Sequence, residues 1–403
     1  MTLSHLSRRQ VLAACGTSAG ITGLSTLTGQ STSAAAPVNG SWPLGRGDSA
    51  NTGYTDARGP TNSVSVRWTF DEHLVARKPP VIKDGYLYVG TFEDTAAFVA
   101  LDAATSKERW RTDLGDGMDV RFNGSAAAIA GDVVLAGFGE VLFAFDTETG
   151  KERWRRSFSD SEIRAPVVAE GIVYVVVGGT GTVYAIDPAS GDVQWETKIG
   201  EWAPGAAAVV DGTVYASGNH GQTAGFVVAL DAGTGDKQWH HRTNHRLTTP
   251  PAVTDESLYI GEGSGLLSLA TTDGTQRWRF QPQSGSTGEA VDWGYLGSAP
   301  AVHDDTVYVG APDERVYALD ATSGEQRWAF WTWNDVTGDP VVAGDTVYVG
   351  SDDSFIYAFD AASGTRRWEF DTTGRIDGAG GAVVDGILYV STWEDGLYAL
   401  EEK

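Results

Sequence analysis

Tryptophan recurs along this chain at a nearly constant interval, and that interval restricts the possible folds more than any other feature of the sequence. The seven successive spacings are 42, 44, 41, 44, 39, 50 and 40 residues. A period of this length is typical of one four-stranded blade of a β-propeller. The recurring tryptophans are Trp68, Trp110, Trp154, Trp195, Trp239, Trp278, Trp328 and Trp368.

The residues between two of these tryptophans alternate between apolar and polar, as half-buried β-strands do. In the clearest unit, the strand patterns cover residues 299–302, 306–310, 316–320 and 326–330. Asp and Gly stand in the short gaps, where they supply the local hydrogen bonds and positive φ angles of tight turns. Each unit is therefore predicted to be a four-stranded antiparallel blade.

The two ends of the chain hold complementary parts of one blade. The last unit has three strand patterns and ends at Lys403 without its tryptophan strand, whereas residues 66–70 carry Trp68 with no three strands before them. Pairing these fragments would remove exposed sheet edges. We therefore predict an all-β fold over residues 62–403. It is an eight-bladed β-propeller of four-stranded antiparallel blades, and the ring is closed by pairing the N-terminal strand with the C-terminal blade.

The residues around each tryptophan form a repeated motif. Asp stands eight positions before the tryptophan in six units, and Ala270 takes that place in a seventh. Ala-Leu-Asp-Ala at residues 318–321, followed by Gly324 and Trp328, is similar to the repeat of the pyrroloquinoline-quinone-type propeller family. Residues 37–61, which contain Trp-Pro-Leu-Gly-Arg-Gly-Asp, resemble the lead-in segment of that family.

This resemblance implies that the repeated tryptophan docks between neighbouring blades. A buried indole N–H needs an acceptor, and we expect the turn eight residues upstream to be paired with it. The family includes quinone-dependent dehydrogenases and also non-enzymatic propellers, such as the lipoprotein of the bacterial outer-membrane assembly machinery. The present chain resembles that lipoprotein more than the dehydrogenases.

The N-terminus has the features of an export signal. Arg8 and Arg9 stand in Ser-Arg-Arg-Gln-Val-Leu, and a weakly apolar stretch and a small-residue site follow them. This pattern is typical of a twin-arginine signal. Residues 1–36 are therefore predicted to direct export to the cell exterior or the cell surface, with cleavage after about Ala35. Leu-Ala-Ala-Cys at residues 12–15 also resembles a lipoprotein box, so a lipid anchor at Cys15 is the alternative and the one predicted contact with a membrane.

The chain is strongly acidic, with 53 acidic residues against 29 basic ones and a formal net charge of -24. This charge argues against nucleic acid or anionic lipid as a partner. Acid excess with only seven lysines favours a protein kept soluble in high salt, and an ordinary acidic secreted protein is the alternative. Since Cys15 is the only cysteine, the mature chain would have no disulfide, thiolate metal site or cysteine nucleophile.

Several aromatic residues stand outside the repeated position, in segments that follow an outermost strand or link the second and third strands of a blade. Both connection types emerge on one face of a propeller, so we expect these aromatics to gather around one opening and form a recognition surface. The alternative is that they only cover the ends of the blades. The residues are Trp202, Trp293, Tyr295, Trp331, Trp333 and Trp393.

Basic residues and histidines are dense at residues 240–246, and the same face should carry them. A metal site would need three converging imidazoles, but His240 and His241 would point to opposite faces of a continuous strand. A local cationic spot that attracts an acidic ligand, or a solvated loop, are the two remaining interpretations. The candidate binding residues of this group are His220, His241, His245, Arg246 and Arg375.

These features favour an exported binding or scaffolding propeller over an enzyme. The partner would be a protein, a small ligand or a glycan, and we expect a monomer. A quinone-dependent dehydrogenase of the family would show an adjacent cysteine pair, calcium ligands and a catalytic aspartate, so pyrroloquinoline quinone with calcium is expected only if the oxidoreductase alternative holds. A cell-surface polysaccharide-binding module is the third hypothesis. We predict no catalytic and no metal-binding residue.

Overall fold

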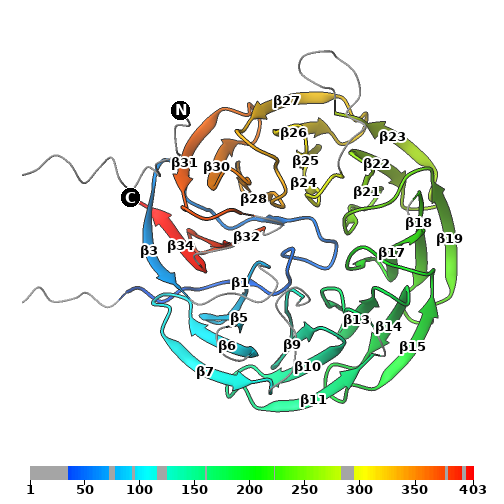
Figure 1. Ribbon diagram of the computed structural model, residues 1–403, viewed down its shortest axis with the longest axis horizontal. Coiled ribbons are helices and arrows are strands. Elements are labelled where there is room, and N and C mark those ends of the chain that lie inside the picture. Colours follow the sequence, from blue (N-terminus) through cyan, green and yellow to red (C-terminus); the bar gives the residue numbers. More distant parts are fainter. Residues whose placement is uncertain are drawn as a thin grey trace, which may run out of the picture. The chain divides into compact units, whose positions relative to one another are not determined.

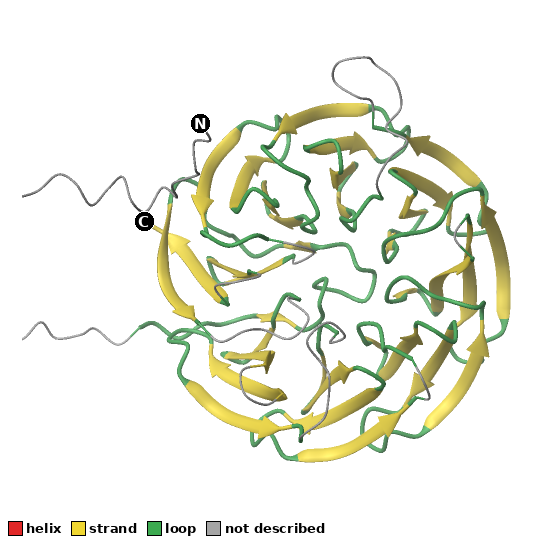
Figure 2. Ribbon diagram, in the orientation of Figure 1, coloured by secondary structure: helices red, strands yellow, loops and turns green. Residues whose placement is uncertain are grey.

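The repeats fold into eight β-sheets that surround a centre, as predicted (Figures 1 and 2). The structure is a computed structural model, and it describes residues 35–71, 78–92, 96–115, 125–158, 161–221, 223–282, 295–376, 380–392 and 396–403. The predicted export signal up to residue 34, Cys15, Trp293 and Trp393 lie outside these residues. Ala36–Lys403 form one compact unit, and no helix long and apolar enough to cross a membrane occurs in the part of the chain that is described.

Each complete blade is an antiparallel meander whose first strand lies innermost and whose fourth strand lies outermost (Figure 1). Blade 1 contains β4 (Val81–Lys83), β5 (Tyr86–Phe92), β6 (Ala96–Asp102) and β7 (Glu108–Asp113). Blade 2 contains β8 (Ala128–Ala130), β9 (Val133–Phe138), β10 (Val141–Asp146) and β11 (Glu152–Ser157). Blade 3 contains β12 (Val167–Ala169), β13 (Ile172–Val177), β14 (Thr182–Ile186) and β15 (Val193–Lys198). Blade 4 contains β16 (Ala208–Val210), β17 (Thr213–His220), β18 (Ala224–Asp231) and β19 (Lys237–Thr243).

The second half of the ring repeats this order, and its last blade joins the two chain ends. Blade 5 contains β20 (Ala252–Val253), β21 (Ser257–Glu262), β22 (Gly265–Ala270) and β23 (Gln276–Phe280). Blade 6 contains β24 (Ala301–His303), β25 (Thr306–Ala311), β26 (Arg315–Asp320) and β27 (Gln326–Trp331). Blade 7 contains β28 (Val341–Ala343), β29 (Thr346–Gly350), β30 (Phe355–Asp360) and β31 (Arg366–Asp371). Blade 8 contains β32 (Gly381–Val384), β33 (Ile387–Ser391), β34 (Leu397–Glu402) and β3 (Val64–Phe70).

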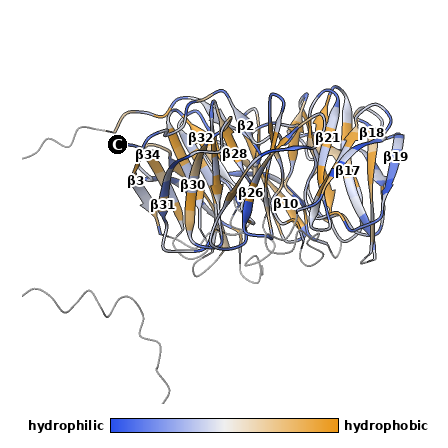
Figure 3. Ribbon diagram, turned by 90° about the horizontal axis from the view of Figure 1, so that it is seen from above, coloured by the Kyte–Doolittle hydropathy of each residue, from blue (hydrophilic) through white to orange (hydrophobic). Residues whose placement is uncertain are grey.

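The hydrophobic core lies between successive blades. One cluster, for example, joins Phe98 of blade 1 to Val134 and Phe143 of blade 2. Because each sheet is covered on both faces, middle strands such as β9 are buried along their whole length, so the expectation of half-buried strands is wrong for them. It holds for outermost strands such as β31, where exposed residues are interspersed with buried and half-buried ones and hydrophilic colour dominates in Figure 3.

The repeated tryptophans dock between blades, as the family resemblance implies. Each indole Nε1 donates a hydrogen bond of 2.8–3.1 Å to a backbone carbonyl. Trp328, which lies opposite Ala318 in its own blade, donates to Ala361 O at 2.9 Å in the following blade. The prediction that the upstream turn of the same blade is the acceptor is therefore wrong, because the indole reaches across the blade boundary.

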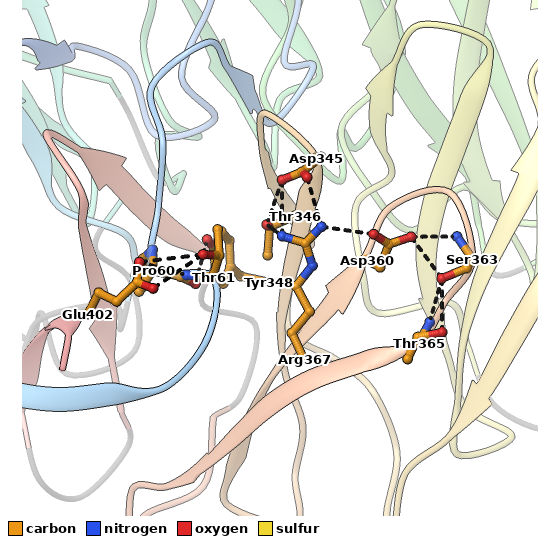
Figure 4. Close-up of polar contacts among 10 residues, drawn as sticks. All are labelled: Pro60, Thr61, Asp345, Thr346, Tyr348, Asp360, Ser363, Thr365, Arg367 and Glu402. Atoms are coloured by element: carbon orange, nitrogen blue, oxygen red, sulfur yellow. Dashed lines mark hydrogen bonds and ion pairs between the residues drawn. The ribbon is translucent and has the colours of Figure 1, made fainter.

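The turn that receives an indole has an Asp and a Gly with separate functions. In blade 7, Asp360 Oδ1 accepts the backbone N–H of Ser363 at 2.9 Å (Figure 4). Gly364 has a φ of 70°, and a Cβ there would lie 2.6 Å from Trp328 Cδ2. Arg367 ties this turn to the first turn of the blade through ion pairs of 2.8 Å with Asp345 and Asp360.

The ring closes through blade 8, as predicted. The strand β3 pairs with β34, with Trp68 opposite Ala399. No turn can join these two strands, because they belong to opposite chain ends. Pro60 O takes the place of the missing turn by accepting Trp368 Nε1 at 2.8 Å and Tyr348 Oη at 3.0 Å. Figure 4 shows Pro60 beside Thr61, whose backbone N–H donates to Glu402 at 3.3 Å.

The lead-in segment crosses the centre of the ring, which the sequence analysis did not anticipate. Its strands β1 (Ser41–Trp42) and β2 (Tyr54–Thr55) extend the inner edges of blades 1 and 7 (Figure 1). Between them, backbone carbonyls of the segment accept N–H groups from the inner edges of blades 2, 4, 5, 6 and 7, at 2.7–2.9 Å. The donors are Ile129, Val209, Val253, Val302 and Val342.

Candidate functional site

The candidate site lies on the edge of the ring that we call the loop face. It carries the connections between second and third strands and those from an outermost strand to the next blade. In blade 4 the pairs His220–Ala224 and Thr243–Gly225 put both connection types at the same end of the sheet. The predicted site residues that the structure describes belong to such connections or to the strand ends beside them, except His241, which lies within β19.

Four residues from successive connections form a group of stacked cations and aromatic rings, here called the Arg246 cluster: Arg164, Trp202, Arg246 and Tyr295. The Arg246 guanidinium lies 4.5 Å from the ring centroid of Trp202 and 5.9 Å from that of Tyr295. Arg164 lies 5.4 Å from the Trp202 ring. Such contacts hold both cations at fixed positions on the surface. Arg164 was missed by the sequence analysis, because only its contact with Trp202 distinguishes it.

A buried carboxylate holds the backbone that presents Arg246. Glu262 is 3 % exposed, and its Oε1 accepts the N–H groups of Asn244 and His245 at 3.1 Å. Arg279 forms an ion pair with the same carboxylate. Glu262 therefore holds the backbone of the connection after β19, and this contact positions Arg246.

The histidines are divided between different environments. His220 and His240 flank the buried ring of Phe226, with centroid distances of 4.9 and 5.4 Å. Burial, with the nearby charge of Arg242, lowers the pKa of His240. His241 lies opposite Val227 and His240 opposite Val228, so they face opposite sides of the sheet, as predicted. In the described part of the chain, no three His, Cys, Asp or Glu residues form a group that could hold a metal ion.

The described aromatic residues make two separate sets of contacts, and their gathering around one opening stays a prediction, because Trp293 and Trp393 lie outside the described residues. Trp331 ends the outermost strand β27, with its Nε1 donating to Glu314 at 3.0 Å and Arg315 5.0 Å from its ring. Trp333 follows two residues later and donates its N–H to Asp353 at 3.0 Å. These two side chains are 59 % and 82 % exposed. A connection begins at the rim and ends at the centre, so residues directly after the outermost strand stay at the rim.

Arg375 lies in the corresponding connection of the next blade. It pairs with Asp352, whose other oxygen accepts the hydroxyl of Thr337 at 2.7 Å. Arg375 therefore belongs with the surroundings of Trp333 rather than with the Arg246 cluster.

A cavity of about 210 Å³ lies where the inner ends of the connections meet the lead-in segment. Its walls include Pro79, Pro166, Pro204 and Pro250. Its charged lining residues are Arg46, Lys78, Arg164 and Asp339. Arg164 is thus shared between the cavity and the Arg246 cluster, and burial lowers its pKa. The cluster and the cavity form one continuous candidate site.

The fold and the site define an eight-bladed propeller with tryptophan-docked blades and a cation-lined cavity at one end of its centre. A family model described as outer membrane protein assembly factor BamB matches residues 60–119, 117–226 and 268–402. The chain therefore belongs to the pyrroloquinoline-quinone-type propeller family. Curated proteins compared by sequence give no match.

Several solved structures share the fold. The quinohemoprotein alcohol dehydrogenase from Comamonas testosteroni is 18% identical, with a TM-score of 0.71 over 89% of this chain and 80% of that one. BamB from Moraxella catarrhalis is 18% identical, with a TM-score of 0.64 over 85% of this chain and 98% of that one. A europium-containing methanol dehydrogenase is 15% identical, with a TM-score of 0.69 over 88% and 89%. These likenesses establish the shared fold alone.

The residues that line the cavity do not fit a quinone held together with calcium. Calcium takes six to eight oxygen ligands, several of them from carboxylates. Asp339 is the one carboxylate among the described lining residues, and it already binds Arg46 at 3.0 Å and the N–H of Ala299 at 2.7 Å. The described lining residues therefore offer too few carboxylate oxygens for a calcium ion.

Proposed function

We propose that this protein is an extracytoplasmic binding or scaffolding propeller that engages an acidic ligand or partner through the loop face around its centre. The Arg246 cluster is the observation that carries the proposal. Two guanidinium groups stack on Trp202 within one contiguous group, on a chain whose net charge is -24. A fixed cationic spot on an acidic surface selects partners that bring carboxylates.

The aromatic members of the cluster support binding rather than only packing. Tyr295 is 56 % exposed, and Trp202 is partly exposed between the two arginines. Tyr, Trp and Arg are the residues that most often dominate the energy of protein interfaces. The cluster therefore combines the electrostatic and apolar contributions that a recognition surface needs.

The proposed location outside the cytoplasm rests on the twin-arginine pattern of residues 1–36. The match to the assembly-factor model and the likeness to BamB are consistent with it. Mass spectrometry of the native N-terminus tests the export route. A mature chain starting near residue 36 is expected, whereas a lipid-modified Cys15 would favour the anchored alternative, and an intact Met1 would contradict both.

A comparative capture experiment tests the binding surface. Immobilised protein is incubated with native envelope extract at high salt, because an acid-rich chain is expected to keep its fold there. A component retained by the wild type should be lost from the Trp202→Ala/Arg246→Ala double variant. Arg155→Ala is the matched control, because Arg155 also stacks on an aromatic ring, Phe143, but on the outermost strand of blade 2. Retention that is equal in all three proteins would contradict the proposal.

Polysaccharide binding is a second candidate function, favoured by the exposure of Trp331 and Trp333. Exposed indole faces can stack on sugar rings. The indole of Trp331 is held by its hydrogen bond to Glu314, and the backbone of Trp333 is held by its hydrogen bond to Asp353. Binding on a glycan array that disappears in the Trp331→Ala/Trp333→Ala variant would support it. A flat array would count against it.

The oxidoreductase alternative has a direct test. Purified protein mixed with pyrroloquinoline quinone and calcium should show no dye reduction with alcohol substrates, because Asp339 is the one carboxylate among the described lining residues and is already paired with Arg46. Reduction at a rate proportional to protein concentration would overturn the binding proposal in favour of an enzyme.

A further inference from the structure

The cavity at the centre of the loop face has a floor that the lead-in segment supplies. Arg46 O accepts the N–H of Gly53 at 3.1 Å. This hydrogen bond joins the two ends of the stretch that crosses the centre and makes it a closed loop. The Arg46 side chain is held there by Asp339 at 3.0 Å and by Pro300 O at 2.5 Å. Arg46 is therefore a buried cation in the lining of a cavity, delivered by a segment outside the repeats.

The guanidinium of Arg46 has five N–H donors, and Asp339 and Pro300 O accept from two of its nitrogens. Arg46 is 9 % exposed, yet its Nε has no hydrogen-bond partner in the described part of the chain. Thr248 Oγ1 is a second buried lining atom without a partner there. Both atoms are closed to solvent, so a ligand in the cavity would instead meet the terminal nitrogens of Arg46, which have more N–H groups than Asp339 and Pro300 accept.

The charged side chains of the cavity lining are mostly positive, which also favours an anionic ligand. Arg46 is paired with Asp339, and Arg164 with Glu162 at 3.1 Å. Lys78 is exposed and has no ion pair among the described residues. One uncompensated cation therefore remains beside the cavity of a chain whose net charge is -24. The local excess is positive where the molecule as a whole is negative.

The cavity has room for a small ligand. Its volume of about 210 Å³ is far above the ~10–15 Å³ that a single water molecule needs. The four prolines of the wall present apolar surface. A planar carboxylate matches the donor geometry of a guanidinium better than a spherical ion does.

We propose that this cavity binds a compact carboxylate, either a free organic acid or the C-terminal carboxylate of a peptide. The inference rests on the proposed function, because it assigns a ligand class to the same loop face. Lys78 and the remaining terminal N–H groups of Arg46 contact the carboxylate, and the proline walls contact its apolar part. Arg164, which reaches both the cavity and Trp202, connects the bound carboxylate to the Arg246 cluster.

Isothermal titration calorimetry with defined probes tests the inference. The probes are succinate, its neutral diamide, inorganic phosphate, and the tripeptide Gly-Gly-Ala with a free or an amidated C-terminus. Binding of succinate or of the free-acid tripeptide supports the proposal, and which of the two binds identifies the source of the carboxylate. Binding of the diamide or amidated peptide at equal strength, binding of phosphate alone, or binding of no probe overturns it.

Variants connect the signal to the cavity. Lys78→Gln should weaken carboxylate binding about tenfold, since one charge-assisted hydrogen bond is lost, whereas Arg155→Gln on blade 2 should leave it unchanged. Arg46→Gln should weaken it further. If that variant does not fold, the Lys78→Gln result alone decides, and an unchanged affinity there overturns the proposal.

The two proposals fail separately. Capture from envelope extract that depends on Trp202 and Arg246, together with no carboxylate binding, would leave the binding propeller standing and remove the cavity ligand. Carboxylate binding that depends on Lys78, together with capture that ignores the Arg246 cluster, would do the reverse.

Discussion

The two faces of this ring differ in how far their contacts repeat from blade to blade. On the turn face, which carries the connections between the first and second strands and between the third and fourth strands, the same contacts recur from blade to blade. Examples are the Arg327 ion pairs with Asp305 and Asp320, and the Arg367 ion pairs with Asp345 and Asp360. On the loop face, the ion pair of Arg46 with Asp339 and the stacking of Arg246 on Trp202 each occur once among the described residues. The difference indicates that the turn face joins the blades, whereas the loop face is free to specialise.

The largest expected effect is the loss of a docking tryptophan. Trp328→Ala should lower the free energy of unfolding by about 3–5 kcal/mol, because it leaves a cavity between blades 6 and 7 and removes one of the two hydrogen bonds to Ala361 O. Trp333→Ala on the loop face should change it by less than about 0.5 kcal/mol. Chemical denaturation measures both values, and equal losses would break the comparison between the faces.

A matched pair of glycines sharpens the comparison within one blade. Both Gly364 and Gly344 have positive φ angles, of 70° and 57°, but only Gly364 faces an indole, since nothing lies within 4 Å of a Cβ at Gly344. Gly344→Ala should cost about 1 kcal/mol of backbone strain. Gly364→Ala should cost about 2–4 kcal/mol, because steric overlap with Trp328 is added. Thermal unfolding of both variants tests this order, and equal melting temperatures would refute it.

The lead-in segment lies outside the repeats, yet we expect its contacts to stabilise the ring. Asn51 Nδ2 donates to Ala207 O at 2.8 Å and to Pro251 O at 3.1 Å, and the residue is buried. Asn51→Ala should therefore destabilise the protein by about 1–3 kcal/mol, since two buried acceptors lose their donor. Ser49→Ala, at a less buried position, is the control and should cost about 1 kcal/mol. A stable Asn51→Ala variant would mean that the segment is not needed to hold the ring together.

The smallest expected effect concerns the turn-face ion pairs at low pH. The hydrogen bond from Arg367 is the main cause that lowers the pKa of Asp360 to about 2, below the ordinary value of about 3.9. A group whose pKa is lower in the folded state stabilises the protein above the unfolded pKa, and this stabilisation is lost as the pH falls through the folded pKa.

Arg367→Gln should therefore cost about 0.5–1 kcal/mol at pH 6, a small value because the carboxylate is partly exposed to solvent. The difference from the wild type should decrease steadily between pH 4 and pH 2.5. Unfolding free energies of both proteins along this pH series test the assignment. A difference that stays constant over the range would rule out Asp360 as the titrating group.

Sequence reasoning was most successful where the interactions are local and repeated. The eight blades and the pairing of β3 with β34 follow from periodicity and from the complementary chain ends, and the family resemblance implies the docking of Trp68 and its equivalents. The opposite orientation of His240 and His241 follows from strand geometry alone. Arg164 and Arg46 gave no comparable signal, because each is a single residue whose environment comes from segments far away in the sequence.

The sequence by itself determined the number of blades, the strand order and the face on which each connection emerges, since alternating strand direction depends only on counting strands. Only the tertiary structure decided how far from the centre each side chain lies, which blade accepts each indole, and that residues 43–53 fill the middle of the ring. The physical reason is that these contacts arise between neighbouring blades and across the closed ring. Contacts of that kind depend on how the sheets stack, and no short pattern in the chain records it.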